Sequence, residues 1–217
     1  MSRIYYDAEM TGLHRNTTLI SLGMVSESGK YFYAEFTDYD SSQVNLWIRN
    51  NVLDNLIFDS PKFDIINATS KGWNVEICGT KEEIKKELLE WLDSELISTD
   101  NRTELEIENG ATSFIEIFTD CYAYDWMLLV DLLAGDAMSM PEYISYIPID
   151  LSTLLWVLEE DPDITREEFI FSENKNNSIP KGLKKHNSLY DAYVIKECFE
   201  KVDQMLNAIE DYDDIDD

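Results

Sequence analysis

Two carboxylates at the end of an apolar run constrain the fold of this chain more than any other feature. Residues 3–8, Arg-Ile-Tyr-Tyr-Asp-Ala, have the apolar and aromatic content of a buried central strand, and Glu9 follows directly. Side chains at positions i and i+2 of a strand project from the same face. The sequence therefore predicts a rigid strand that directs Asp7 and Glu9 to one place.

Other apolar patterns predict further strands and helices in an order typical of an α/β fold. The predicted strands are residues 3–8, 17–26, 31–36 and 114–118. The predicted helices follow the capping box Thr80-Lys-Glu-Glu83 or span 124–133, 151–158 and 187–209. We expect a central mixed β-sheet flanked by helices.

The length of the chain suits one domain, which we place at residues 1–209. Residues 210–217 hold six acidic side chains, a composition typical of a solvated, disordered tail.

Cysteine usage and the N-terminal sequence favour a reduced, cytoplasmic protein. The three cysteines are odd in number and widely spaced, with no CxxC pair, so we expect reduced thiols in or near the core. The N-terminus has neither a basic region nor a long apolar run, so we expect neither secretion nor membrane insertion.

Two further acidic signatures follow the first in a fixed order. Asp125 stands at the start of a predicted helix, and His186 precedes Asp191 by five positions near the start of another. Each signature alone has a simpler explanation. Acidic pairs on strands are often only solvated, and acids in the first turn stabilise the helix dipole. Four carboxylates and one histidine together are the parts of a two-metal phosphodiester hydrolase.

Carboxylate sites of this kind suit hard divalent cations. Mg²⁺ and Mn²⁺ prefer oxygen ligands and keep open positions for substrate phosphate and water. Two ions about 3.5–4 Å apart can activate the attacking water and stabilise the leaving 3′ oxygen. We therefore expect two Mg²⁺ or Mn²⁺ ions as cofactors.

The signatures resemble the motifs of the DEDDh 3′–5′ exonuclease superfamily, which includes RNase T and oligoribonuclease. Asp7-Ala-Glu-Met-Thr-Gly-Leu13 resembles the first motif, and His186-Asn-Ser-Leu-Tyr-Asp-Ala192 resembles the third. The resemblance implies four metal ligands: Asp7, Glu9, Asp125 and Asp191. It also implies that His186 accepts a proton from the attacking water, a role that suits imidazole with its usual pKa of about 6.5.

The middle motif leaves two candidates. In the family an aspartate follows the fourth strand at the start of a helix, and Asp125 fits this place with the aromatic Tyr124 before it. Asp120 is the competitor, and it could instead cap the turn after the strand. We favour Asp125.

The family also implies substrate contacts for the residues after the first acidic pair, which approach the 3′-terminal nucleotide through backbone groups and an apolar wedge. Here these residues are Met10, Thr11, Gly12 and Leu13. Glycine allows a close backbone approach, and methionine and leucine offer apolar surface to a base.

A narrower resemblance is to the small mycobacterial-type 3′–5′ exoribonucleases. It is carried by Thr18-Leu-Ile-Ser-Leu-Gly-Met-Val25, Gly29-Lys-Tyr-Phe-Tyr-Ala34, Trp47-Ile-Arg-Asn-Asn-Val-Leu53 and Ala123-Tyr-Asp125. This resemblance implies an RNase H-like fold and a homodimer. The segment 54–113 is longer than the corresponding segment of the family, so the resemblance implies nothing about its structure or role.

The predicted function is that of a divalent-metal-dependent 3′–5′ exoribonuclease, which releases nucleoside monophosphates from single-stranded RNA 3′ ends. The net charge of −27 argues against broad duplex binding, since such proteins present a basic face. The residues do not separate RNA from DNA, so a DNA 3′–5′ exonuclease is one alternative. A catalytically silent acidic binding protein is the other.

Overall fold

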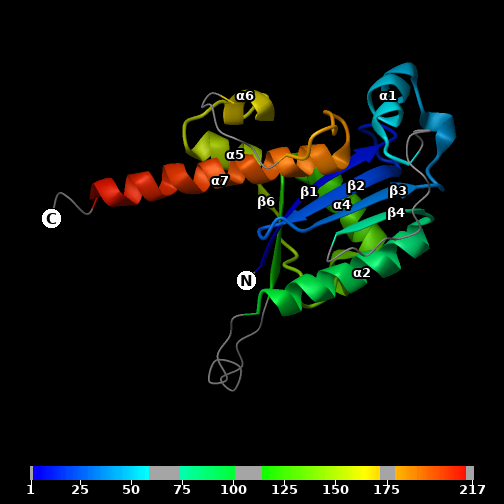
Figure 1. The fold of residues 1–217 in the computed structure, drawn as a ribbon, viewed down its shortest axis with the longest axis horizontal. Coiled ribbons are helices and arrows are strands. Elements are labelled where there is room, and N and C mark those ends of the chain that lie inside the picture. The colour runs from blue at the N-terminus through cyan, green and yellow to red at the C-terminus, as the bar shows by residue number, and fades with distance from the viewer. Residues whose placement is uncertain (1, 59–73, 101–113, 172–178, 214–217) are drawn as a thin grey trace.

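The computed structural model describes residues 2–58, 74–100, 114–171 and 179–213. A six-stranded sheet lies at the centre, in the order β4-β3-β2-β1-β5-β6 (Figure 1). Its strands are β1 (Ser2–Met10), β2 (Leu19–Ser26), β3 (Tyr31–Phe36), β4 (Val75–Gly79), β5 (Ile115–Thr119) and β6 (Ile149–Asp150).

The sheet is mixed. β1, β2 and β3 form an antiparallel meander, while β5 pairs in parallel with β1, and β6 with β5. β4 extends the other edge in parallel with β3. This sheet with its flanking helices confirms the predicted fold class, an α/β fold with a central mixed sheet.

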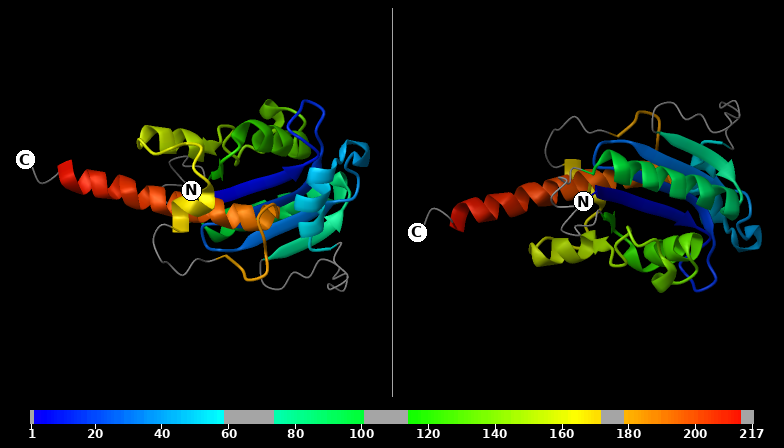
Figure 2. Two further views of the ribbon diagram at one scale, coloured as in Figure 1. Left: turned by 90° about the horizontal axis from the view of Figure 1, so that it is seen from above. Right: turned by 90° about the horizontal axis from the view of Figure 1, so that it is seen from below.

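Helices cover both faces of the sheet (Figures 1 and 2). They are α1 (Leu46–Asn51), α2 (Lys81–Ser98), α4 (Tyr122–Leu133), α5 (Leu151–Val157), α6 (Arg166–Phe171) and α7 (Ser188–Asp213). Short 3₁₀ turns lie at Ser41–Gln43, Leu53–Asn55 and Ala137–Ser139.

The alternation of side chains along β1 divides the core between the two faces. Ile4, Tyr6 and Ala8 belong to the apolar cluster that packs under α2 and α4. Tyr5 belongs to the opposite cluster, which is built from α5, α6 and α7. Because a strand has a period of two, Asp7 shares the face of Tyr5 and points toward the α7 layer.

The predicted capping box at the start of α2 is confirmed. The Thr80 side chain accepts a hydrogen bond from the Glu83 backbone N–H, and the Glu83 carboxylate accepts one from the Thr80 backbone N–H at 2.8 Å. Each bond satisfies a donor that the first turn would otherwise leave unpaired.

Several elements differ from those expected. β4, β6 and α6 were not predicted, because each is only two to six residues long and shows too little periodicity. Residues 54–113 supply β4 and α2. The last helix was predicted to end at 209 but runs to Asp213, and residues 214–217 of the predicted acidic tail lie outside the described residues.

The expected burial of the cysteines and the expected lack of membrane insertion can be compared with the structure. Cys198 is buried as expected, whereas Cys78 and Cys121 are exposed rather than near the core. In the described ranges, every helix is too short or too polar to cross a membrane.

Candidate active site

β1 carries the first predicted pair of site residues, Asp7 and Glu9, at its C-terminal end. Tyr5, on the same face, packs against Phe118 of β5 and Phe199 of α7, with ring centroids 5.5 and 5.9 Å away. This aromatic packing anchors β1 to its neighbours two residues before the first carboxylate. The strand therefore fixes both carboxylates on the face that α7 covers.

β5 and α4 bring Asp125 to the same edge of the sheet. β5 runs parallel to β1, so the carboxyl ends of both strands lie together. Thr119 ends β5, and its hydroxyl donates a hydrogen bond of 2.7 Å to Oδ2 of Asp125 in the first turn of α4. Asp125 is buried, so this bond sets the orientation of its carboxylate.

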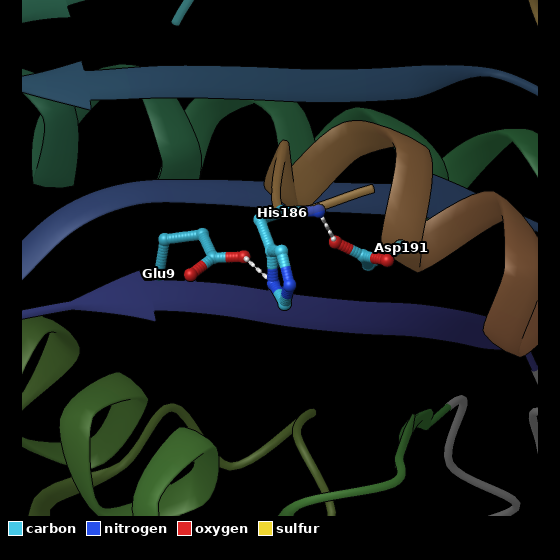
Figure 3. Close-up of side chains that lie close together, drawn as sticks. All are labelled: Glu9, His186 and Asp191. Atoms are coloured by element: carbon cyan, nitrogen blue, oxygen red, sulfur yellow. Dashed lines mark hydrogen bonds and ion pairs between the residues drawn. The ribbon is translucent and has the colours of Figure 1, made fainter. Parts of the chain in front are cut away.

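The turn before α7 and the first turn of α7 supply the third predicted pair, His186 and Asp191. The backbone N–H of His186 donates a hydrogen bond of 2.8 Å to Oδ2 of Asp191 (Figure 3). His186 has a φ of 65°, in the left-handed region that few residues other than glycine adopt. The hydrogen bond supports this conformation and ties the histidine to the aspartate.

A glycine in β2 allows α7 to begin this close to the sheet. Gly23 pairs with Asp7 in the β1–β2 register, and a Cβ atom at Gly23 would lie 2.3 Å from the backbone carbonyl oxygen of Ser188. The Ser188 hydroxyl also hydrogen-bonds the Ser21 hydroxyl at 3.0 Å. A side chain at position 23 would displace the helix that carries Asp191.

The predicted residues meet in two neighbouring groups. Within each group, one candidate ligand atom per residue lies within 4.8 Å of the others. The groups are Glu9, His186 and Asp191, and Asp7, Asp120 and Asp125. One pocket of about 180 Å³ reaches both groups; its lining residues are Asp7, Glu9, Asp120, Arg166, Glu167, Lys185, His186, Asp191, Val194 and Ile195.

Burial and mutual repulsion raise the pKa of three of these carboxylates. Burial, followed by the charges of Asp191 and Asp125, raises the pKa of Asp7 well above its usual value. Burial is also the main cause that raises the pKa of Asp125 and of Asp191. Oδ2 of Asp7 is buried and has no hydrogen-bond partner among the described residues. Such a site favours the binding of protons or cations.

His186 lies between a carboxylate and an aromatic ring. Its Nδ1 is 3.6 Å from Oε1 of Glu9 (Figure 3), and its ring meets the Trp47 ring edge-on with centroids 5.1 Å apart. About a third of the histidine side chain is exposed, at 33%. The imidazole is therefore held in place and remains accessible from the pocket.

The four predicted substrate-contact residues have different surroundings. Met10 is buried in the core, and Thr11 is buried with its hydroxyl donating to Gln43 Oε1 at 2.5 Å. Gly12 has a φ of 150°, and Leu13 is 68% exposed. Of the two predicted apolar side chains, only that of Leu13 offers apolar surface to a ligand.

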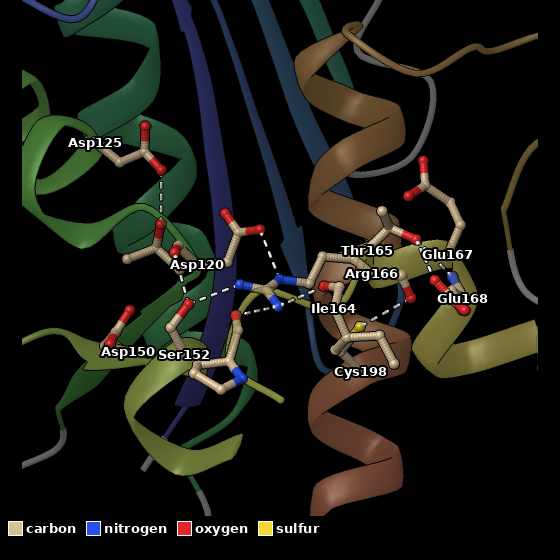
Figure 4. A network of polar contacts seen from close by, with 12 residues as sticks. Asp120, Asp125, Asp150, Ser152, Ile164, Thr165, Arg166, Glu167, Glu168 and Cys198 are labelled. Atoms are coloured by element: carbon tan, nitrogen blue, oxygen red, sulfur yellow. Dashed lines mark hydrogen bonds and ion pairs between the residues drawn. The ribbon is translucent and has the colours of Figure 1, made fainter. Parts of the chain in front are cut away.

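Asp120, the competitor of Asp125 in the sequence, lies in the same group as Asp125. It does not cap α4, whose N-cap residue is Cys121 and which has no side-chain cap. Its Oδ2 instead accepts a hydrogen bond of 3.0 Å from Nε of Arg166 (Figure 4). No sequence pattern marked Arg166, because a lone arginine in a short helix 46 positions away has no recognisable motif.

Curated relatives of this chain are 3′–5′ exoribonucleases from two strains of Mycobacterium tuberculosis. Each is 37% identical over 54 residues. The match covers 25% of this chain and 32% of each relative, so the chain spans about a third of the length of the relatives it matches. The resemblance seen in the sequence is confirmed over this stretch. No protein-family model matches the chain.

Two solved structures are also similar. The first is the nuclease domain of 3′hExo, a DEDDh family member bound to rAMP, with 12% identity, a TM-score of 0.45 and coverage of 95% of this chain and 92% of that chain. The second is the catalytic unit of Neurospora crassa Pan2, with its protease and nuclease domains. It has 14% identity and a TM-score of 0.39, and the match covers 99% of this chain and 29% of that chain.

Proposed function

We propose that this chain is a divalent-metal-dependent 3′–5′ exoribonuclease that releases nucleoside monophosphates from single-stranded RNA 3′ ends. The observation that carries the proposal is the convergence of distant residues on one pocket. β1 contributes Asp7 and Glu9 to the pocket lining, and the start of the α7 region contributes His186 and Asp191. Asp125 of α4 is buried, and one of its carboxylate oxygens lies within 4.8 Å of one of Asp7. A pocket that collects acids from three elements at a cost in repulsion is typical of a cation site.

The residues fit two Mg²⁺ or Mn²⁺ ions. Asp7, Glu9, Asp125 and Asp191 would hold them, since carboxylate oxygens are the ligands these cations prefer. Oδ2 of Asp7 has no hydrogen-bond partner in the described part of the chain, which supports this fit because a buried anionic oxygen is costly without a cation or a proton. The ions would supply Lewis-acid activation of a water and of the scissile phosphate.

His186 would accept the proton of the attacking water. The Glu9 carboxylate lies on the Nδ1 side of the ring and favours a proton there, which leaves Nε2 as the acceptor. Glu9 would therefore act both as a ligand and as a support for the histidine. Leu13 and the backbone near Gly12 would contact the terminal nucleotide.

RNA is proposed as the substrate because the curated relatives are named exoribonucleases. The net charge of −27 favours short or single-stranded ends over long duplexes. The expected homodimer and cytoplasmic location stay predictions, and a mass measurement in solution would test the first.

Labelled oligomers test the reaction and the substrate together. RNA and DNA of one sequence, labelled at the 5′ or the 3′ end, would be incubated with the protein and Mn²⁺, Mg²⁺ or EDTA. We expect metal-dependent stepwise shortening of 5′-labelled RNA and release of a labelled mononucleotide from 3′-labelled RNA. Faster cleavage of DNA would make the protein a DNA exonuclease. No cleavage of either polymer with either metal would favour an acidic binding protein.

A further inference from the structure

Asp120 is a fifth carboxylate in a centre for which the sequence predicted four. It follows β5 directly and lines the same pocket as Asp7 and Asp191. A candidate ligand atom of Asp120 lies within 4.8 Å of those of Asp7 and Asp125. An additional acid at this distance from two others adds repulsion, and its charge contributes to the raised pKa of both neighbours.

Arg166, at the start of α6, holds Asp120 from outside the cluster of Asp7, Asp120 and Asp125. Its Nε donates to Oδ2 of Asp120 at 3.0 Å (Figure 4). A carboxylate has two oxygens with several acceptor positions, and this contact uses one of those oxygens. Among the described residues, none donates a hydrogen bond to Oδ1 of Asp120. This oxygen is therefore available to a ligand in the pocket.

The guanidinium of Arg166 is itself fixed by groups outside the site. Nη1 donates to the backbone carbonyls of Pro162 and Ile164 at 3.1 and 3.0 Å, and Nη2 donates to the Ser152 hydroxyl at 2.7 Å (Figure 4). The side chain is only 15% exposed. The Ser152 hydroxyl also donates to the backbone carbonyl of Asp120 at 3.5 Å, so only the contacts to Pro162 and Ile164 are independent of Asp120. These two contacts hold the guanidinium in place, and its bond to Oδ2 then constrains the Asp120 carboxylate.

We propose that Asp120 is a fifth carboxylate of the metal centre and that Arg166 is the positioning residue that holds it beside Asp7 and Asp125. This rests on the proposed function, since it assigns a further residue to the same cation site. Arg166 offsets part of the repulsion among the carboxylates and keeps one oxygen of Asp120 free to face the pocket. The α6 segment thereby takes part in the site without contributing a ligand.

The simpler alternative is that Asp120 and Arg166 form only a structural ion pair between the end of β5 and α6. The two roles differ in what a substitution changes. If the pair is only structural, its loss lowers the free energy of unfolding but does not change the affinity for metal. Loss of a ligand, or of the group that orients it, commonly weakens metal affinity about 10–100-fold.

Calorimetric titration with Mn²⁺ would separate these roles without relying on activity. The variants are Asp120→Asn and Arg166→Lys. Asparagine keeps an oxygen that can accept from Arg166, and lysine keeps the charge but loses the planar fork of donors. Asp131→Asn on α4 and Arg49→Lys on α1 are controls with the same change of side-chain type, at exposed positions outside the pocket. Thermal unfolding in EDTA would verify that every variant is folded.

We expect each site variant to bind Mn²⁺ about tenfold or more weakly than wild type, with both controls unchanged. The inference is overturned if wild type binds Mn²⁺ and both site variants bind it equally tightly. Failure of wild type itself to bind Mn²⁺ would instead contradict the proposed metal-dependent function. The two failures are therefore distinguishable in one set of titrations.

Discussion

Asp7 interacts with residues of both clusters in the candidate site. It lies next to Asp125 and Asp120 in one group and is also repelled by Asp191 of the other. Its buried Oδ2 has no hydrogen-bond partner among residues 2–58, 74–100, 114–171 and 179–213. In the absence of a cation, the ionised form of this side chain opposes folding.

Asp7→Asn should therefore stabilise the metal-free protein and abolish hydrolysis. We expect its free energy of unfolding in EDTA near neutral pH to rise by about 1–2 kcal/mol, because the repulsion is relieved. Denaturant unfolding followed by circular dichroism would measure the change. The exposed control Asp131→Asn should show no such rise. Wild-type hydrolysis by Asp7→Asn would show that this carboxylate is not part of the site.

His186 combines an unusual backbone conformation with the proposed chemical role. Its φ of 65° is tolerated by asparagine better than by most residues. His186→Asn should therefore keep the loop while removing the proton acceptor, and turnover should fall about 10²–10⁴-fold. Single-turnover rates would measure the loss, with Mn²⁺ titration as the control for an intact metal site. An unchanged rate would show that His186 has no catalytic role.

Much of the site could be predicted from residue type and order. Asp7 and Glu9 share a strand face by simple periodicity, and a known motif places His186 and Asp191 at the start of a helix. Asp120 and Asp125 looked like alternatives because a sequence does not show that both of them can lie beside Asp7. Arg166 was missed because its three fixing contacts come from the fold.

At the scale of elements, the contact between β2 and α7 determines where the last helix begins. Gly23 leaves room for the Ser188 backbone, and the same region of α7 carries Asp191. The hydroxyl pair of Ser21 and Ser188 reinforces this contact. The geometry of the proposed metal ligands therefore depends on Gly23, a residue that does not line the pocket.

Gly23→Ala should disturb both the stability and the site. The new methyl group would meet a backbone carbonyl that cannot rotate away, so we expect a loss of about 1–3 kcal/mol in the free energy of unfolding. A shift of α7 by about 1 Å would also lower activity by about a hundredfold. Gly29→Asn is the control for a glycine replaced without a steric clash, since nothing lies within 4 Å of that position. Its φ of 85° adds backbone strain, so the control can lose some stability but should keep full activity. Full activity in Gly23→Ala would mean that the helix start can move freely.

Elements with a strong local signal were predictable, and those defined by their neighbours were not. The meander of β1 to β3 and the capped α2 follow from apolar alternation and capping chemistry. β4 is short and partly exposed, and it is a strand because β3 offers it a parallel partner. α6 has six residues, and its packing against α7 is a tertiary effect.

At the scale of the whole molecule, the acidic pocket couples stability to pH. Asp7, Asp125 and Asp191 all have a raised pKa in the folded state. The folded state therefore holds their protons more tightly than the unfolded state does. Their contribution to stability is lost as pH rises from the unfolded-state value of about 4 through the raised folded-state values.

The metal-free protein should consequently lose stability as pH rises above about 4, and divalent cations should protect it most at the highest pH tested. Thermal unfolding at several pH values, with EDTA or with Mn²⁺, would measure this. The decrease should be smaller in Asp7→Asn, because one of the coupled carboxylates is absent. A decrease of equal size in both proteins would place the pH dependence outside the pocket.

The most direct single measurement follows the length of 5′-labelled single-stranded RNA over time, with wild type and Asp191→Asn side by side in Mn²⁺. We expect wild type to shorten the RNA stepwise from its 3′ end, EDTA to stop the reaction, and Asp191→Asn to leave the RNA intact. Shortening by Asp191→Asn at the wild-type rate, or intact RNA with metal-loaded wild type, would contradict a metal-dependent exoribonuclease centre built on these carboxylates.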